Sequence, residues 1–244
     1  MSLKTMSPHY RNKMAFVRSA LSKVPRDSRI LDVGCGYGEY MELFREMGFS
    51  NVSGLDTDRK ALEGQECVVL CAGESMPFKP SSFDVVTCIS VLEHAEDDRR
   101  VLDEIRRVLR PGGIAIIVVP SSAYPFTYDP VNAFLRPFGR RVGIGMWAWG
   151  HRRLYEKRLF EGMLLRNGFR IERKSQITHA FVTLFMGYGP FLAGSLMRRS
   201  FGKSRGKAPG RQPFIGRLYG KLAEIDEKWF SWTPCVEMGF VLRK

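Results

Sequence analysis

The chain has 244 residues and a mass of 27.8 kDa, with 44% hydrophobic and 26% charged residues. These figures describe one globular domain with a sizeable core, and they exclude a disordered chain, a collagen-like repeat and a small disulfide scaffold. The formal net charge is +13, and two stretches account for all of it: residues 136–158 carry a net +6 and residues 198–217 a net +7. The rest of the chain is neutral overall, and two basic segments of this kind predict an anionic partner. The candidates are nucleic acid, a membrane surface and a phosphorylated small molecule.

The chain has five cysteines, an odd number, and its first residues do not read as a secretory signal. We therefore expect reduced, mostly buried cysteines in a cytoplasmic protein. Cys67 and Cys71 are four residues apart, but no second Cys/His pair has a zinc-like spacing, so we expect no metal site.

The spacing of apolar residues predicts alternating helices and strands. In chain order we expect a helix over 14–24, a strand at 29–33, a helix over 40–47, a strand at 52–55, a very short helix near 58–62, strands at 67–70 and 83–89, a helix over 97–109, a strand at 114–119, a helix over about 155–167, and strands at 169–176 and 236–243. Pro111-Gly112-Gly113 is expected to end the helix over 97–109. The repeated strand-then-helix order predicts an open, doubly wound α/β fold with a parallel sheet and no second independent domain.

Residues 175–197 carry no formal charge and include many apolar side chains. A bilayer span needs roughly 20 predominantly apolar residues, whereas three glycines, Pro190 and several polar residues interrupt this run. We therefore expect an interfacial or substrate-covering hairpin rather than a transmembrane helix.

The sharpest motif is Asp32-Val33-Gly34-Cys35-Gly36-Tyr37-Gly38, at the expected turn from the first strand into its helix. Three glycines let a ligand approach the backbone closely, and a helix N-terminus presents free N–H groups. The spacing differs from that of dinucleotide-binding loops, and an acid precedes the glycines. The next strand ends at Asp56, where a carboxylate can accept hydrogen bonds from a ribose diol.

With these residues the chain resembles the class I S-adenosylmethionine-dependent methyltransferases. Three further segments carry the resemblance, in the family's order: Ser75-Met76-Pro77-Phe78 leading to Ser82-Phe83-Asp84-Val85-Val86, Val91-Leu92-Glu93-His94, and Val108-Leu109-Arg110-Pro111-Gly112-Gly113. It covers residues 28–120 densely, returns at 166–169, and looks closest to the small-molecule branch that includes the ubiquinone and menaquinone C-methyltransferases. It implies a seven-stranded sheet with an antiparallel last strand, a single domain over 1–244 with its cofactor-binding core at 28–120, and substrate-covering inserts at 121–153 and 177–232.

The resemblance also implies S-adenosylmethionine as the cofactor. Asp32 would help to hold its ammonium group, Asp56 would bind the ribose hydroxyls, and Thr57 would lie beside the adenine. The other positions implied at the cofactor are Gly34, Cys35, Gly36 and Gly38 in the glycine motif, Ile89 and Ser90 at the methionine end, and Ala72, Gly73 and Glu74 near the adenine. Ala72 stands where the family commonly has an aspartate, so adenine recognition is expected to use backbone groups or Glu74.

Two histidines are candidates for the catalytic role. Methyl transfer from a sulfonium needs a base only when the acceptor must first lose a proton. His94 follows the fourth strand, at the edge where such sheets bind ligands, and a helix-entry residue is the alternative interpretation for it. His151 precedes the helix over 155–167 and is expected to contact the substrate, with a plain surface histidine as the alternative.

The two inserts leave the ligand-binding edge of the sheet and carry both basic segments, so they should decide the acceptor. Apolar surface beside cationic residues favours a small, apolar or lipid-linked acceptor, methylated at O or C, and docking on an anionic membrane surface. A roof over the active site and a dimer face of a homo-oligomer are the alternatives. An RNA methyltransferase of the wobble-base type and a non-catalytic cofactor-binding protein also remain open, although Ser90-Val91-Leu92 lacks the Pro-Pro-aromatic motif of base-amine methylation.

Overall fold

The structure is a computed structural model, and it describes residues 8–122, 136–138, 140, 151–179, 221, 224–225, 228–229 and 235–244. The chain divides into two compact units. We call residues 13–122, 150–175 and 237–244 the core unit, and the second unit consists of residues 1–12, 123–149 and 176–236. In the second unit, Thr178 accepts hydrogen bonds from the Asn12 amide at its hydroxyl (3.3 Å) and from the Val236 N–H at its carbonyl (2.9 Å).

The sheet has seven strands in the order β3-β2-β1-β4-β5-β7-β6. Their bounds are β1 Arg29–Val33, β2 Asn51–Asp56, β3 Val68–Leu70, β4 Phe83–Ile89, β5 Leu109–Pro120, β6 Arg170–Ile177 and β7 Glu237–Arg243. Strands β1 to β5 pair in parallel, and β7 runs antiparallel to β5. The expected doubly wound sheet with an antiparallel last strand is therefore confirmed.

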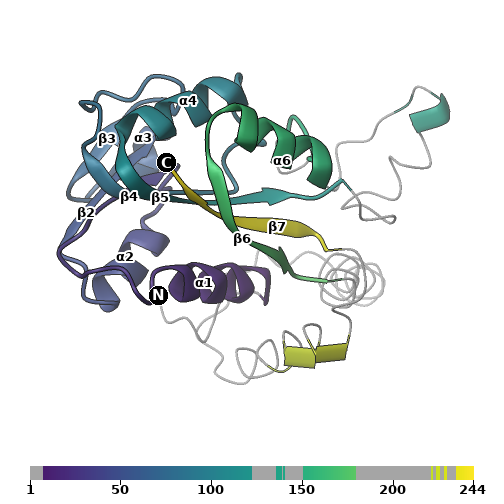
Figure 1. Cartoon of the computed structure of the whole chain (residues 1–244), viewed down its shortest axis with the longest axis horizontal. Coiled ribbons are helices and arrows are strands. Elements are labelled where there is room, and N and C mark those ends of the chain that lie inside the picture. Colours follow the sequence, from purple (N-terminus) through teal and green to yellow (C-terminus); the bar gives the residue numbers. More distant parts are fainter. Residues whose placement is uncertain are drawn as a thin grey trace, which may run out of the picture. The chain divides into compact units, whose positions relative to one another are not determined.

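The helices are α1 Pro8–Ala20, α2 Glu39–Glu46, α3 Arg59–Leu62, α4 Asp98–Val108 and α6 Lys157–Arg166, with a 3-10 turn η2 at Arg136–Phe138. Figure 1 shows α4 and α6 on one face of the sheet and α1 and α2 on the other. Helix α4 shows why such segments are helical. The Asp97 carboxylate caps its first turn by accepting from the N–H groups of Arg99 and Arg100, and its apolar residues at helical spacing are fully buried.

The strand order reverses between β1 and β4, which lie side by side while their connections leave in opposite directions. In open α/β sheets the crevice at the carboxyl ends of two such strands is where ligands bind. The residues that follow β1 and β4 are the glycine motif, from Gly34, and Ser90–His94. The fold thus brings two of the segments identified in the sequence to one edge.

The fourth helix ends within one residue of the expected position, but the next strand begins earlier than the expected residue 114. Helix α4 ends at Val108, and Pro111-Gly112-Gly113 lies inside β5 instead of stopping the helix. The reason is a tertiary pairing: Leu109 already pairs with Phe83 of β4, and the register then shifts before Val85 pairs with Ile114. A bulge of this kind absorbs the extra residues without breaking the strand.

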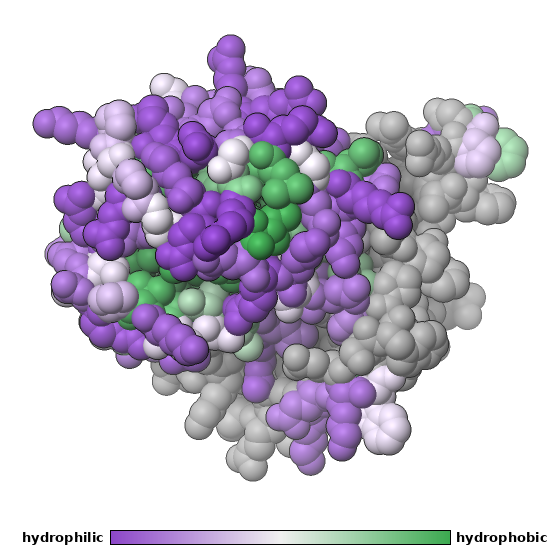
Figure 2. Space-filling view, viewed as in Figure 1, coloured by the Kyte–Doolittle hydropathy of each residue, from purple (hydrophilic) through white to green (hydrophobic). Residues whose placement is uncertain are grey.

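None of the five cysteines forms a disulfide, and Cys35, Cys88 and Cys235 are buried. No helix among the described residues is long and apolar enough to cross a membrane. Residues 175–177 of the expected hairpin belong to the end of β6, while residues 180–197 and most of both inserts lie outside the described residues. In the view of Figure 2 hydrophilic residues cover most of the described surface, and hydrophobic residues gather in a few separate places.

Candidate active site

The glycine motif forms a tight loop between β1 and α2. The N–H groups of Gly34 and Cys35 both donate to the Leu55 carbonyl at the end of β2, at 2.8 and 2.9 Å. Gly34, Gly36 and Gly38 have φ angles of 71°, 51° and 83°, a region that side chains other than glycine rarely adopt. A Cβ on Gly34 would collide with Val91, so the loop packs directly against the segment after β4.

Gly36 faces open space, since a Cβ placed there would meet no atom within 4 Å. A side chain from outside the motif holds this part of the loop: the Gln65 amide donates to the carbonyls of Gly36 (2.7 Å) and Ala61 (2.6 Å). The sequence analysis missed Gln65, because nothing in its local pattern distinguishes it from a surface residue. The loop is therefore rigidly held and leaves room on one side for a ligand.

The Asp56 carboxylate lies against this open part of the loop. It accepts hydrogen bonds from the N–H groups of Gly36 and Asp58, both at 2.8 Å, and is only partly buried. Each oxygen keeps lone pairs for a further donor, as the expected contact with a ribose diol requires. Thr57, expected beside the adenine, is exposed.

Asp32 is buried beneath the loop, with 1% of its surface exposed. The Thr87 hydroxyl donates to one of its carboxyl oxygens at 2.6 Å, while the other oxygen has no hydrogen-bond partner among the described residues. Burial raises the pKa of Asp32 to about 7, and the nearby Asp56 and Glu39 add to the shift while the Thr87 hydrogen bond opposes it. A buried carboxyl oxygen without a donor is costly, and the ammonium group of the implied cofactor would supply one.

The remaining residues expected at the cofactor take different positions. Cys35 is buried, and burial together with the charges of Asp32 and Asp56 raises the pKa of its thiol to about 12, so it is a packing residue and not a nucleophile. Gly73 is needed for packing, because its Cβ would lie 3.2 Å from Val101, and Ala72 is exposed. Glu74 accepts from the backbone N–H of Glu96 (2.9 Å), so this oxygen holds the entry to α4.

Ile89 is buried at the end of β4, and Ser90 follows it with a strained φ of 56°. The Ser90 hydroxyl accepts a hydrogen bond at 3.0 Å from the ammonium group of Lys13, which also forms a buried ion pair with Glu237 at 2.9 Å. Lys13 and Glu237 were not identified from the sequence. They come from α1 and β7, at opposite ends of the chain, and only the fold places them at the end of β4.

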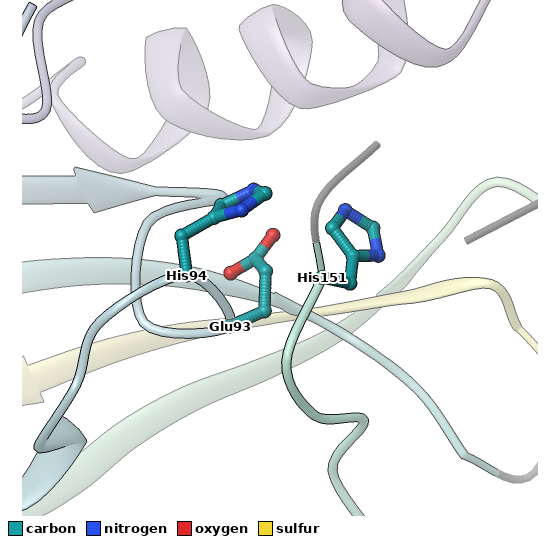
Figure 3. Close-up of side chains that lie close together, drawn as sticks. All are labelled: Glu93, His94 and His151. Atoms are coloured by element: carbon teal, nitrogen blue, oxygen red, sulfur yellow. The ribbon is translucent and has the colours of Figure 1, made fainter. Parts of the chain in front are cut away.

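Both histidines expected to be catalytic meet in the core unit. The rings of His94 and His151 lie 4.9 Å apart between centroids, and the Glu93 carboxylate lies between them (Figure 3). Glu93 is 1% exposed, His151 is partly buried and His94 is exposed. Burial raises the pKa of Glu93 to about 8, while burial and the neighbouring His94 lower the pKa of His151 to about 4.

Backbone and arginine contacts hold His151 beside the turn after β4. The Arg152 N–H donates to the Glu93 carbonyl at 2.8 Å. The Arg153 guanidinium donates to the carbonyls of Ala95 (2.9 Å) and Glu96 (3.1 Å) and pairs with the Asp98 carboxylate at 3.0 Å. The segment around His151 is thus fastened to the residues that carry Glu93 and His94.

We expect Arg153→Ala to lower the free energy of unfolding by about 1–3 kcal/mol, because it leaves two carbonyls without their donor and removes the ion pair of the largely buried Asp98, which keeps only the hydrogen bond from the Tyr155 hydroxyl. Arg152→Ala is the matched control. Its pair with Glu96 is longer (3.6 Å) and exposed, so its removal should cost less than about 0.5 kcal/mol. Urea unfolding of the two variants measures both values, and equal losses would contradict the assigned role of Arg153.

The comparisons with known proteins agree with this geometry. Residues 31–117 match the family described as "Methyltransferase domain". A ubiquinone biosynthesis O-methyltransferase of Ralstonia nicotianae is 38% identical over 96 residues, which cover 35% of this chain and 40% of that protein. The chain thus matches about two fifths of the length of this relative.

Two solved structures share the fold over nearly the whole chain. An S-adenosylmethionine-dependent methyltransferase from Mesorhizobium loti gives a TM-score of 0.59 at 17% identity and covers 100% of both chains. Another from Archaeoglobus fulgidus gives a TM-score of 0.54 at 18% identity and covers 95% of this chain and 94% of that one. At these identities the likeness shows the fold alone.

The described residues fit S-adenosylmethionine, the cofactor that this domain implies. Gly36 leaves room beside the loop, Asp56 presents acceptor oxygens there, and Asp32 has a buried oxygen without a donor. The sequence motifs, the sheet topology and the family match all point the same way. Residues 31–117 therefore match a methyltransferase domain, and the chain has the fold of S-adenosylmethionine-dependent methyltransferases.

Proposed function

We propose that the protein transfers a methyl group from S-adenosylmethionine to a hydroxyl oxygen of a small, apolar or lipid-linked acceptor. Several of the curated relatives are named ubiquinone biosynthesis O-methyltransferases, which favours oxygen over carbon within the branch that the sequence resembles. Their match covers about 35% of this chain, so the proposal for the acceptor rests on this chain's own residues.

One observation carries the proposal: the loop expected to hold the cofactor and the Glu93, His94 and His151 group stand at the same edge of the sheet. Val91 links them, since it packs against Gly34 and lies two residues before Glu93. An acceptor hydroxyl placed between the two would face the cofactor on one side and groups that can take up a proton on the other.

The chemistry asks little of the protein beyond this placement. Bound S-adenosylmethionine would supply an activated methyl group, which would pass to the acceptor oxygen as the carbon–sulfur bond gives its electron pair to sulfur. In our proposal Asp32 and Asp56 orient the cofactor, and the Glu93, His94 and His151 group removes the proton of the hydroxyl. Alignment supplies most of the acceleration, and proton removal adds to it.

Docking on an anionic membrane surface is part of the proposal for lipid-linked acceptors. It rests on the two basic segments, most of which lie outside the described residues. An RNA acceptor remains the second candidate because of the same segments, and a non-catalytic cofactor-binding protein the third.

The test is a labelling experiment. Purified protein is incubated with methyl-labelled S-adenosylmethionine and an extract of the source cells, and the products are divided into organic, small aqueous and nucleic-acid fractions. The proposal expects label in the organic fraction, on an ether that resists mild base. Label in nucleic acid would overturn it in favour of RNA, and tight cofactor binding with no label in any fraction would favour the non-catalytic alternative.

A further inference from the structure

We infer that Glu93, His94 and His151 bind a divalent transition-metal cation, of which Zn²⁺ is the best fit. The metal site stands on these three residues alone. Its role in activating the acceptor hydroxyl rests on the proposed function.

The three side chains present a compact set of donors. One carboxylate oxygen and one ring nitrogen from each histidine all lie within 4.8 Å of one another, and Figure 3 shows the carboxylate of Glu93 between the two imidazoles. Zinc bonds to nitrogen and oxygen at about 2.0–2.1 Å, so two of its ligands lie at most about 4.2 Å apart. In the tetrahedral geometry of zinc the ligands lie about 3.4 Å apart, so the widest pair closes by up to about 1.4 Å on binding, and rotation of the exposed His94 side chain supplies this movement.

Glu93 supplies an independent reason for a cation here. It is 1% exposed, it points into the group, and its second carboxyl oxygen has no hydrogen-bond partner among the described residues. Buried carboxylates are normally paired, hydrogen-bonded or bound to metal. A cation between the two rings would bind this carboxyl oxygen directly. Without a cation, the hydroxyl of the acceptor would have to donate a hydrogen bond to this oxygen and also face the cofactor.

The surrounding charges permit a cation. The Lys13 ammonium is a positive group whose charge acts on both Glu93 and His151, and it pairs with the Glu237 carboxylate at 2.9 Å and hydrogen-bonds to Ser90. The charge of Lys13 is balanced by that of Glu237. A divalent ion bound to the Glu93 carboxylate therefore leaves a net charge of +1 at the site, and the oxyanion of a deprotonated acceptor would neutralise it. Three protein ligands also leave a coordination position open, as in catalytic zinc sites.

The ligand set selects the class of metal. Two imidazoles with one carboxylate suit zinc, iron, cobalt or nickel, whereas magnesium prefers oxygen ligands alone. A cation of this kind beside the acceptor would lower the pKa of its hydroxyl and favour the nucleophilic oxyanion. The expectation of no metal site considered only cysteine and histidine pairs close in sequence. Here two ligands are adjacent and the third lies 57 residues further along, so no local spacing signals them.

The experiment measures metal binding by the full-length protein, without any acceptor. Protein stripped with a chelator is titrated with Co²⁺, whose visible absorption reports its ligands, and then with Zn²⁺ in competition. We expect one Co²⁺ per chain, displaced by Zn²⁺ and not by Mg²⁺. Glu93→Gln and His151→Gln should each weaken Co²⁺ binding at least about 100-fold, since the loss even of an outer-shell partner of a metal site costs about 10–100-fold.

Cys67→Ser is the matched control, because Cys67 is an exposed thiol outside the group that could bind cobalt adventitiously. Its binding should equal that of the wild type. Circular dichroism and cofactor affinity show whether each variant is folded. If folded wild-type protein binds no Co²⁺ at about 100 µM added metal, a concentration at which even a weak site would fill, or if Glu93→Gln and His151→Gln bind it unchanged, the inference is wrong.

The metal and the methyl transfer can fail separately. Specific metal binding with no methyl transfer would keep the site and overturn the proposed function. Methyl transfer that persists at full rate in chelated protein without bound metal would keep the function and overturn the role of the metal in it, leaving the histidines as bases.

Discussion

Gly36→Ala is expected to lower the affinity for S-adenosylmethionine at least about tenfold, and this is the most direct test of where the cofactor lies. Apart from its chain neighbours, no described residue has an atom within 4 Å of a Cβ at this position, so the methyl group would enter the space that we assign to the ligand. The left-handed φ of 51° adds a loss of stability of about 1–2 kcal/mol. Isothermal titration with the cofactor and urea unfolding separate the two effects.

Gly112→Ala is the control for the backbone strain. Gly112 also has a left-handed φ, 75°, and a Cβ there also meets nothing within 4 Å, but it lies in the first part of β5, where the helix α4 has just ended. Its stability should fall by the same amount, about 1–2 kcal/mol, while its cofactor affinity stays that of the wild type. A parallel loss of affinity in both variants would mean that strain, and not occupied space, explains the result for Gly36.

Asp32→Asn is expected to weaken cofactor binding and to remove its pH dependence. Burial raises the pKa of Asp32 to about 7, so in the free protein the carboxyl is mostly protonated at pH 5.5 and about half ionised at pH 7. The cofactor's ammonium group favours the ionised form, so binding releases a proton at low pH. Wild-type affinity should therefore rise about tenfold from pH 5.5 to 7, and that of Asp32→Asn should stay flat. Titration in buffers of different ionisation enthalpy measures the proton released.

The same substitution is expected to stabilise the cofactor-free protein. Because the folded-state pKa of Asp32 lies above its unfolded value of 3.8, the unfolded chain gives up the proton first as pH rises. The free energy of unfolding therefore falls between about pH 4 and 7 and stays low above that. The asparagine side chain carries no such cost and keeps an oxygen for the Thr87 hydroxyl, so at pH 8 the variant should be more stable by about 2 kcal/mol. A variant less stable than the wild type at pH 8 would show that Asp32 is stabilised by contacts other than those described.

A more stable Asp32→Asn variant would agree with the presence of several buried, incompletely hydrogen-bonded carboxyl groups at this edge of the sheet. Asp32, Glu93 and Glu237 are each buried and each keep a carboxyl oxygen without a hydrogen-bond partner among the described residues. Carboxyls of this kind weaken a fold, and their clustering beside a ligand crevice is typical of residues selected for binding. Stability given up in the free protein is recovered when the ligand supplies the missing partners.

The sequence by itself determined the sheet and the cofactor loop. Strands such as β1 and β4 are short apolar runs, and the glycine motif needs only the local conformations of Gly34, Gly36 and Gly38 and the acids at positions 32 and 56. These properties are local to the chain, so they can be read without knowing what packs against them. The exception is the start of β5, which lies at Leu109 and not after Pro111-Gly112-Gly113, because the pairing of Leu109 with Phe83 of β4 outweighed the local Pro-Gly-Gly signal.

The tertiary structure alone decided which side chains meet beyond the loop. Lys13, Glu237 and His151 come from α1, β7 and the segment before α6, and periodicity assigns each to an element without saying what faces it. The hydrogen bond from the Gln65 amide to the Gly36 carbonyl likewise joins residues that are 29 positions apart in the sequence. The two histidines could be selected one by one from the sequence, but their approach to 4.9 Å with Glu93 between them depends on the Arg152 and Arg153 contacts. Chemistry that needs several groups at one point is set by the packing of distant segments, because no single stretch of backbone can bring all of them there.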